Sequence, residues 1–391
     1  MYPRANAYTK TPSIHPLLNH STKQYEAAML RLYKSMTLHL FAVFAIPWTA
    51  SSLPGQDMPV LAPPDVITVG QLPSRIAFGS CGHQSKPMPI LRQAVEKNPD
   101  LFIYLGDNIY GDTKDMKVLA AKYELLNRRP EFQTLRSRVP ILSIWDDHDY
   151  GWNDAGKEYE FKEESKAIFM DFWRVPKDSP RREHTGIYGS HRFTKGDKTL
   201  QIILLDTRTF RDSLTTNPRN LPKDTPFKNQ YQPAENDHTL LGDQQWDWLE
   251  KTHREPADMR VICTSIQFGH EYNGWESWTN LPRQQQKMID LIRTTGAQGV
   301  MFISGDVHWG EISKREIAGL YPLYDVTASG LTEEWPNLET NKFRVGEAYR
   351  KNHFGMIEVD WDQDDPAITL AIVGLDGTQK VGHEIRLSEL R

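Results

Sequence analysis

The sequence of 391 residues has little cysteine, no marked excess of either charge and no long apolar run. Only Cys81 and Cys263 are present, which excludes a fold held together mainly by disulfides, although one bridge between the two stays open. Because 46 basic residues face 51 acidic ones, the formal net charge is -5, and no nucleic-acid-binding patch is evident. The composition therefore predicts an ordinary globular protein of one large or two modest domains.

The N-terminal part differs in pattern from the rest of the chain. Arg31 and Lys34 precede an apolar run that ends at Trp48, and small residues follow it. This order is typical of a secretory signal peptide, and the run is too short to span about 30 Å of hydrocarbon. We therefore expect export to the periplasm or the exterior, with no transmembrane anchor. The predicted parts are an N-terminal extension with its signal peptide, a linker and a folded domain, at residues 1–53, 54–74 and 75–391.

From Arg75 onward, aliphatic runs alternate with helical patterns. The runs that predict buried strands are RIAFGSC, LFIYLGDN, ILSIWDDHD, LQIILLDTR, RVICTSIQF and GVMFISGDVH. Periodicity predicts helices over Met88–Asn98, Met116–Arg138, Glu163–Val175, Asp243–Arg254 and Pro282–Thr295. The alternation predicts a layered α/β domain, and three strand-like segments after residue 320 predict a contribution to a second sheet. The segment Leu214–Asn236 has no periodicity and is expected to form a loop at the rim of a site.

Polar side chains that can bind metals follow the first three predicted strands and the sixth. They are Cys81, Asp107, Tyr110, Asp147, His148, Asp306 and His308. Carboxylates that gather at strand ends repel one another unless a cation neutralises them, so the pattern predicts a metal centre. The phenol of Tyr110, with an ordinary pKa near 10, binds well only to a strong Lewis acid, which favours a trivalent metal such as ferric iron. Zinc, which usually selects histidine and cysteine, fits less well.

The ordered motifs FGSC, GDNIY, WDDHD, LDTRTFR and SGDVH resemble those of the PhoD-like branch of the calcineurin-like metallophosphoesterases. The resemblance extends over roughly residues 75–331. It implies an α/β fold, a four-layer α/β/β/α sandwich with metals at the strand ends. It also implies a phosphatase or phosphodiesterase of the alkaline phosphatase D type, with Fe³⁺ and Ca²⁺ as cofactors and another divalent metal as an alternative at the second position.

Residue by residue, the resemblance implies an iron site made by Cys81, Asp107, Tyr110 and His308, with Asp107 bridging to a second metal. Asp147 takes the place of a metal-binding asparagine, Asp306 belongs to the same centre, and His148 lies near the leaving group. The histidine that the superfamily places before the last motif is absent, and Gln267 is nearest by pattern. An oxygen-rich second position is therefore favoured. Further candidates for metal or phosphate contact are Asn153, Arg211 and Gln267.

A pair of cations would activate water for attack on phosphorus, while His148 would stabilise the transition state or protonate the leaving alkoxide. Arg208 is expected to hold a phosphate oxygen, or else to pair with Asp206. The predicted function is hydrolysis of phosphate monoesters, diesters or both, on small molecules or lipid headgroups. A phospholipase D-type diesterase and a non-catalytic phosphate- or metal-binding protein are the alternatives, and a thiol hydrolase based on Cys81 is less favoured because nearby carboxylates raise the pKa of a thiol.

Overall fold

The computed structural model describes residues 72–218, 229–235, 237–337 and 339–391. The predicted N-terminal extension, its signal peptide and most of the predicted linker lie outside the described residues. Within the described part of the chain, no helix has the length and apolar character needed to cross a membrane.

Two six-stranded sheets form the centre of the described chain. The first sheet contains β1 (Arg75–Gly79), β2 (Leu101–Leu105), β3 (Ile141–Ile144), β12 (His353–Asp360), β13 (Ala367–Gly374) and β14 (Gln379–Arg386). The second contains β4 (Gly189–Lys195), β5 (Lys198–Leu204), β8 (Met259–Cys263), β9 (Val300–Ser304), β10 (Gly310–Arg315) and β11 (Leu323–Ala328). The spatial orders are β14-β13-β12-β1-β2-β3 and β10-β11-β9-β8-β5-β4. A two-stranded sheet, β6 (Thr215–Thr216) with β7 (Tyr231–Gln232), lies in the predicted rim loop.

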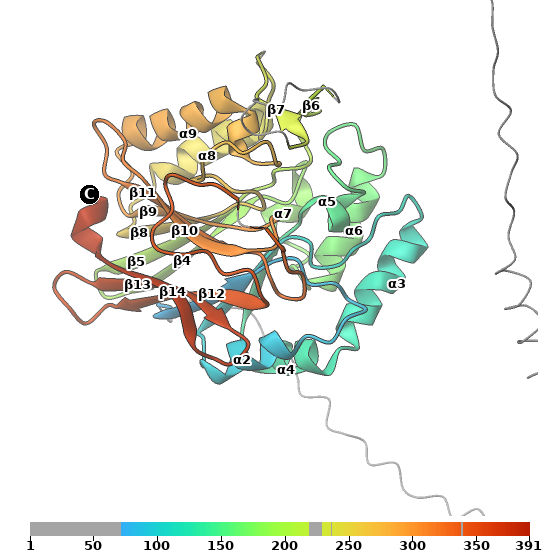
Figure 1. The fold of residues 1–391 in the computed structure, drawn as a ribbon, viewed down its shortest axis with the longest axis horizontal. Coiled ribbons are helices and arrows are strands. Elements are labelled where there is room, and N and C mark those ends of the chain that lie inside the picture. Colours follow the sequence, from blue (N-terminus) through green and yellow to red (C-terminus); the bar gives the residue numbers. More distant parts are fainter. Residues whose placement is uncertain (1–71, 219–228, 236, 338) are drawn as a thin grey trace, which may run out of the picture. The chain divides into compact units, whose positions relative to one another are not determined.

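Helices cover the outer faces of both sheets (Figure 1). The helices on the side of the first sheet are α2 (Pro89–Glu96), α3 (Met116–Asn127), α4 (Pro130–Arg138) and α6 (Lys162–Phe172). On the side of the second sheet lie α8 (Gly242–His253) and α9 (Pro282–Thr295). The short helices are α5 (Asp147–Tyr150), α7 (Pro180–Glu183), η1 (Trp278–Asn280) and η2 (Leu387–Leu390). This arrangement is the predicted four-layer α/β/β/α sandwich.

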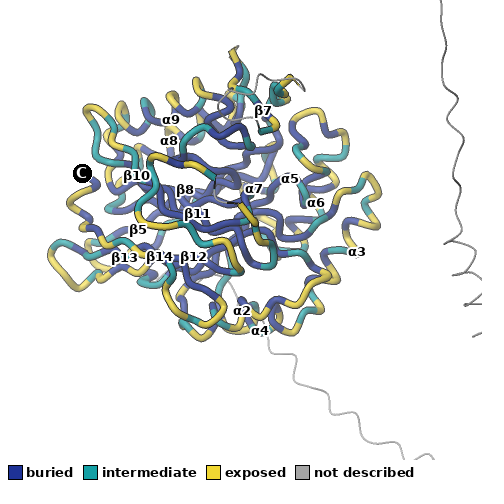
Figure 2. The backbone as a smooth tube through the Cα atoms, viewed as in Figure 1, coloured by how far each residue is buried: buried dark blue, intermediate teal, exposed yellow. Residues whose placement is uncertain are grey.

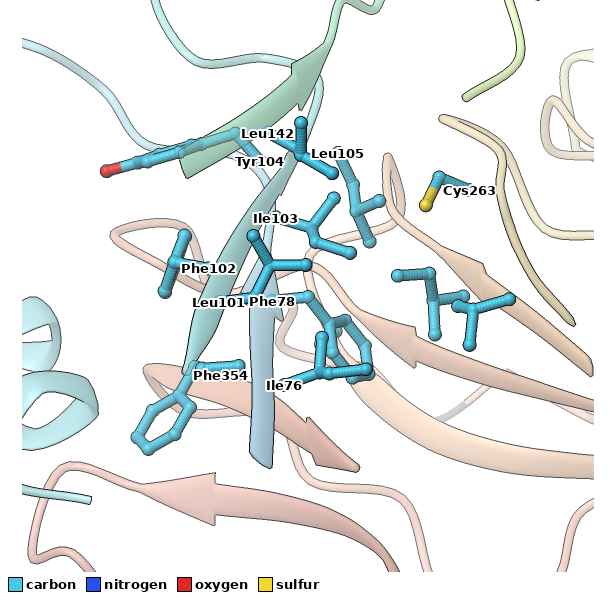
Figure 3. Close-up of a cluster of buried hydrophobic side chains, with 14 of the residues drawn as sticks. Ile76, Phe78, Leu101, Phe102, Ile103, Tyr104, Leu105, Leu142, Cys263 and Phe354 are labelled. Carbon is cyan, nitrogen blue, oxygen red and sulfur yellow. The ribbon is translucent and has the colours of Figure 1, made fainter. Parts of the chain in front are cut away.

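The inner strands β8 and β9 of the second sheet have apolar side chains on both faces, as the continuous aliphatic runs predict. On β8, Val261 and Cys263 belong to the cluster between the sheets, whereas Ile262 belongs to the cluster under α8 and α9. Figure 3 shows Cys263 in the same cluster as Ile103 and Leu105 of β2. Both cysteines are buried and free, so no bridge joins them. Figure 2 shows that burial is concentrated in the strands.

Two predictions about secondary structure are corrected. The predicted helix Met116–Arg138 is interrupted before Pro130, because proline has no amide hydrogen and disfavours helical conformation at the residue before it. The three C-terminal segments do not all contribute to one sheet: β11 lies in the second sheet, whereas β12, β13 and β14 extend the first, because β12 pairs antiparallel with β1. The predictions also missed β4 and β10, whose mixed polar sequences at the edges of the second sheet carry a weak strand signal.

In the first sheet β2 pairs parallel with both β1 and β3, and in the second β8 pairs parallel with both β5 and β9, so the carboxyl ends of these strands lie at one edge of each sheet. The motif residues follow these strand ends, where open α/β sheets place their ligand sites. The two sheets are close enough at this edge that residues after β1, β2 and β9 approach one another.

Candidate metal centre and active site

The residues predicted to bind iron converge at the ends of β1, β2 and β9. Ligand atoms of Cys81, Asp107 and His308 lie within 4.8 Å of one another. The Cys81 thiol donates to Asp107 Oδ2 at 3.4 Å, and the hydroxyl of Tyr110 is 3.2 Å from His308 Nε2. One thiol, one carboxylate, one phenol and one imidazole therefore meet at a single point, which is the donor set expected for the first metal position.

The backbone at these positions adopts a conformation that side chains rarely allow. Cys81, Asp107, Asp306 and His308 have φ values of 59°, 49°, 72° and 66°. For residues other than glycine this left-handed region costs energy, and such residues are frequent at functional sites. Gly106 (φ 101°) precedes Asp107, and an added Cβ there would lie 2.6 Å from the amide nitrogen of Asp146. Only glycine therefore allows the ends of β2 and β3 to approach this closely.

Carboxylates surround Asp107. Asp107, Asp146 and Asp306 form one group of possible metal ligands, and Asp107, Asp147 and His148 form another. Burial and the neighbouring Asp147 raise the pKa of Asp107 well above its usual value, and burial with Asp146 does the same for Asp306. Asp107 Oδ1 and Asp146 Oδ2 are buried without a hydrogen-bond partner. Because unpaired carboxylate oxygens are costly to bury, this arrangement fits bound cations.

A second acidic cluster of Asp147, Asp154 and Glu276 adjoins the first. Asp147 Oδ2 accepts a hydrogen bond from the Asp154 amide at 2.5 Å. Burial raises the pKa of Asp147, but Arg208 and His148 outweigh it and lower that pKa to about 2, whereas burial and Glu276 raise the pKa of Asp154 to about 7. All ligands here are oxygens, as Ca²⁺ prefers.

The sequence prediction missed Asp154 and Glu276. Asn153, which it selected instead, lines the same cavity and donates from Nδ2 to Asp154 Oδ2 at 2.6 Å. The signal for Asp154 was its position directly after Asn153 in the motif, but nothing in the sequence indicated that Glu276 would enter from a loop after β8.

His148 pairs with a carboxylate that the sequence prediction also missed. Its Nδ1 lies 2.7 Å from Oδ1 of Asp112, which is partly exposed. Burial lowers the pKa of His148, but the hydrogen bond that His148 donates to Asp112 and the charge of Asp147 outweigh it and raise the pKa to about 9. Asp112 thus favours the protonated imidazole and fixes the ring, so Nε2 is the atom that can donate a proton.

The two arginines lie beneath the cavity rather than on its lining. Arg208 is fully buried, its Nη1 donates to both carboxylate oxygens of Glu276 at 2.9 Å, and its Nε donates to Asp146 at 2.5 Å. Arg211 Nε is 3.2 Å from Glu276. This placement does not support the predicted phosphate contacts. Asp206 does not pair with the side chain of Arg208 either, since it accepts the backbone amide of that residue at 2.9 Å.

Gln267 is also away from the metal ligands. Its side chain is buried, and Nε2 donates to Glu311 at 2.9 Å and to the Thr327 hydroxyl at 3.0 Å. It does not line the cavity that holds the candidate metal ligands. The amide nitrogen thus faces β10 and β11, and this placement does not support the predicted metal or phosphate contact of Gln267.

Polar and aromatic groups share the lining of the cavity at this site. The polar part includes Asp107, Asp147, His148, Asn153, Asp154, Glu276, Asp306 and His308, and the aromatic part includes Tyr231, Trp275, Trp309 and Trp335. The predicted rim loop contributes Gln230 and Tyr231, whose hydroxyl donates to Asp154 at 2.5 Å.

Two facing sheets between helical layers, with possible metal ligands at the strand ends, define a metallophosphoesterase-type protein. Residues 76–317 match the model of the PhoD-like phosphatases, and the chain belongs to this family of phosphoric ester hydrolases. It is 23% identical over 272 residues to alkaline phosphatase D of Bacillus subtilis (strain 168), an alignment that covers 59% of this chain and 45% of that relative. The chain thus spans less than half the length of that curated relative. A solved structure of PhoD matches with a TM-score of 0.61 at 16% identity, covering 81% of this chain and 69% of that one.

Proposed function

We propose that the protein hydrolyses phosphate esters of small molecules, monoesters, diesters or both, with two kinds of metal ion at the strand-end site. The observation that carries the proposal is the meeting of the Cys81, Asp107, Tyr110 and His308 donors with the acidic cluster beside His148. Family membership supports the same reaction. The sequence pattern around Arg31 and Lys34 supports export as part of this proposal.

Cys81, Asp107, Tyr110 and His308 would hold Fe³⁺, whereas Asp107, Asp147, Asp154 and Glu276 would supply oxygens to Ca²⁺. Asp306 would add a further oxygen where the two groups meet. When bound, the cations would lower the pKa of a water molecule and neutralise the phosphoryl oxygens. Binding Fe³⁺ would require Cys81 and Tyr110 to lose their protons, which burial opposes, since it raises the pKa of both groups well above normal.

The chain's own groups would perform the proton transfer. Hydrolysis forms a bond from the water oxygen to phosphorus and breaks the bond from phosphorus to the ester oxygen, which needs a proton to leave as an alcohol. His148, kept protonated by Asp112, lies at the cavity and can supply that proton from Nε2. Arg208 and Arg211 would act behind the site by holding Glu276 and Asp146 in place.

The test is to measure metal content on full-length protein purified without chelator, together with hydrolysis of 4-nitrophenyl phosphate and bis(4-nitrophenyl) phosphate. We expect iron and calcium and turnover of at least one ester, and the ratio of the two rates reports the preference for monoesters or diesters. His148→Asn should abolish most turnover and retain metal, while Asp290→Asn, which changes a half-exposed side chain on α9, should change neither. Metal-loaded protein with no turnover of either ester would refute the enzymatic proposal.

A further inference from the structure

Three tryptophans from separate segments meet on one side of the cavity. Trp275 follows β8, Trp309 lies between β9 and β10, and Trp335 lies between β11 and β12. The rings of Trp275 and Trp335 are 5.4 Å apart and nearly perpendicular at 84°, and Trp309 lies 6.5 Å from Trp335 at 42°. The proposed hydrolysis uses none of these rings.

A shared carboxylate fixes the corner made by Trp275 and Trp335. Both indole nitrogens donate to the same oxygen, Oε1 of Glu339, at 3.2 Å. The backbone of Glu339 is itself held, because its carbonyl accepts a hydrogen bond from Arg344 at 2.6 Å. Trp275 is also adjacent in sequence to Glu276, which two buried arginines hold. The corner is therefore built before any ligand arrives, which is the condition for selective binding.

The tryptophan rings lie beside His308, one of the residues proposed to hold metal. The ring of Trp335 is 6.3 Å from that of His308, and Trp309 follows His308 in the sequence. A phosphate held by the metal ligands would therefore place its organic group against these rings. Trp309 is largely buried, so its ring has little freedom to move away from the cavity that it lines.

We propose that the site selects phosphate esters whose organic group is an uncharged, flat aromatic ring, such as an aryl or a nucleobase. This inference rests on the proposed function. Two perpendicular indole rings can bind a third aromatic ring between them. The third ring can stack on one indole and contact the other edge to face, and these are the two arrangements that aromatic pairs prefer. Among the described residues, no lysine or arginine lines this cavity, so nothing there would receive a further anionic group.

The experiment compares esters of primary alcohols that differ in the attached group: 2-phenylethyl, 2-cyclohexylethyl, choline and ethyl phosphate. A second comparison, of thymidine 5′-phosphate with 2-deoxyribose 5-phosphate, tests whether a nucleobase gives the same preference as a phenyl ring. We expect kcat/KM for 2-phenylethyl phosphate to exceed that for the cyclohexyl and ethyl esters by about tenfold, as two aromatic contacts would give. A gain for thymidine phosphate over its sugar phosphate would identify a nucleoside-type ligand, and its absence beside a phenyl preference would identify an aryl-type ligand.

Two variants test the corner itself. Trp335→Leu should reduce the ratio of phenylethyl to ethyl kcat/KM by about fivefold, and Glu339→Ala should reduce it less, since both rings remain but lose their shared acceptor. Trp361→Leu is the matched control, because Trp361 lies at the turn after β12 and donates to the Pro73 carbonyl. That variant should retain the ratio of the unaltered protein.

Each outcome separates this inference from the proposed function. Equal turnover of all esters, or fastest turnover of the choline or cyclohexyl ester, would overturn the aromatic preference and leave the phosphoesterase proposal intact. A phenyl preference that survives Trp335→Leu and Glu339→Ala would overturn the assignment to this corner. Failure of metal-loaded protein to hydrolyse any ester would refute the proposed function, and with it this inference.

Discussion

The two ligand clusters of the site differ in where their residues come from. The first, Cys81, Asp107 and His308 with Tyr110, is built from turns directly after β1, β2 and β9, and it mixes sulfur, nitrogen and oxygen donors. The second, Asp147, Asp154 and Glu276, draws two of its three members from loops and offers oxygen alone. The strand ends therefore carry the sulfur and nitrogen donors that discriminate between metals, and the loops carry oxygen donors alone.

The largest effect should follow from a change to Asp107, which the first cluster shares with the Asp147 and His148 group. Asp107→Asn removes a carboxylate that would be a ligand common to both proposed metal positions. We expect loss of both metals and a fall in kcat of about a thousandfold or more. Metal analysis and steady-state kinetics check this. Retention of one metal at full occupancy would show that the two clusters bind metal independently and would contradict a shared role of Asp107.

Arg208→Met should destabilise the fold rather than only weaken substrate binding. The change leaves Asp146 and Glu276 buried without their shared cation, a loss that costs about 3–5 kcal/mol. Urea unfolding of the metal-free protein measures it. A variant of unchanged stability with a raised KM would instead support the phosphate contact that the sequence predicted.

A matched pair of variants should separate the two clusters. Cys81→Ser should lower iron content and spare calcium, because it removes the soft donor of the first cluster. Glu276→Gln should weaken calcium binding by about 10–100-fold and spare iron, because it removes a charged oxygen of the second. Titration with each metal alone gives both affinities. Parallel loss of both metals in either variant would contradict separate positions.

The smallest effect is expected at Asp112, which acts through His148. Because the pKa of His148 is raised to about 9, its protonated form is present below that pH and is lost as pH rises through it. Asp112→Asn removes the main favourable partner, so the alkaline limb of the kcat profile should move to lower pH, with kcat reduced about tenfold at its optimum. A uniform fall in rate with an unshifted limb would indicate only a structural role.

The sequence alone predicted most of the layered fold and the first cluster, because buried strands have long aliphatic runs and their ends carry Cys81, Asp107, Tyr110 and His308. Of the second cluster it predicted Asp147 and the oxygen-rich character, but not Asp154 or Glu276. Glu276 and Asp112 reach the site through the paths of loops, which local patterns do not specify. For the same reason the orientation of Gln267 could not be predicted, since strand alternation no longer determines which way a side chain points once β8 has ended at Cys263.

The pairing of β12 with β1 joins segments that lie far apart in the sequence and are therefore synthesised at very different times. Arg75 lies opposite Glu358. Until β12 is available, the edge of β1 that later pairs with it has unsatisfied amide and carbonyl groups, a ready template for association with other chains. Such distant pairing also slows folding, because a long loop must close before the contact forms. The turn that carries Cys81 therefore gains its full support only late in folding, and a chain truncated before β12 should aggregate rather than retain a weakened site.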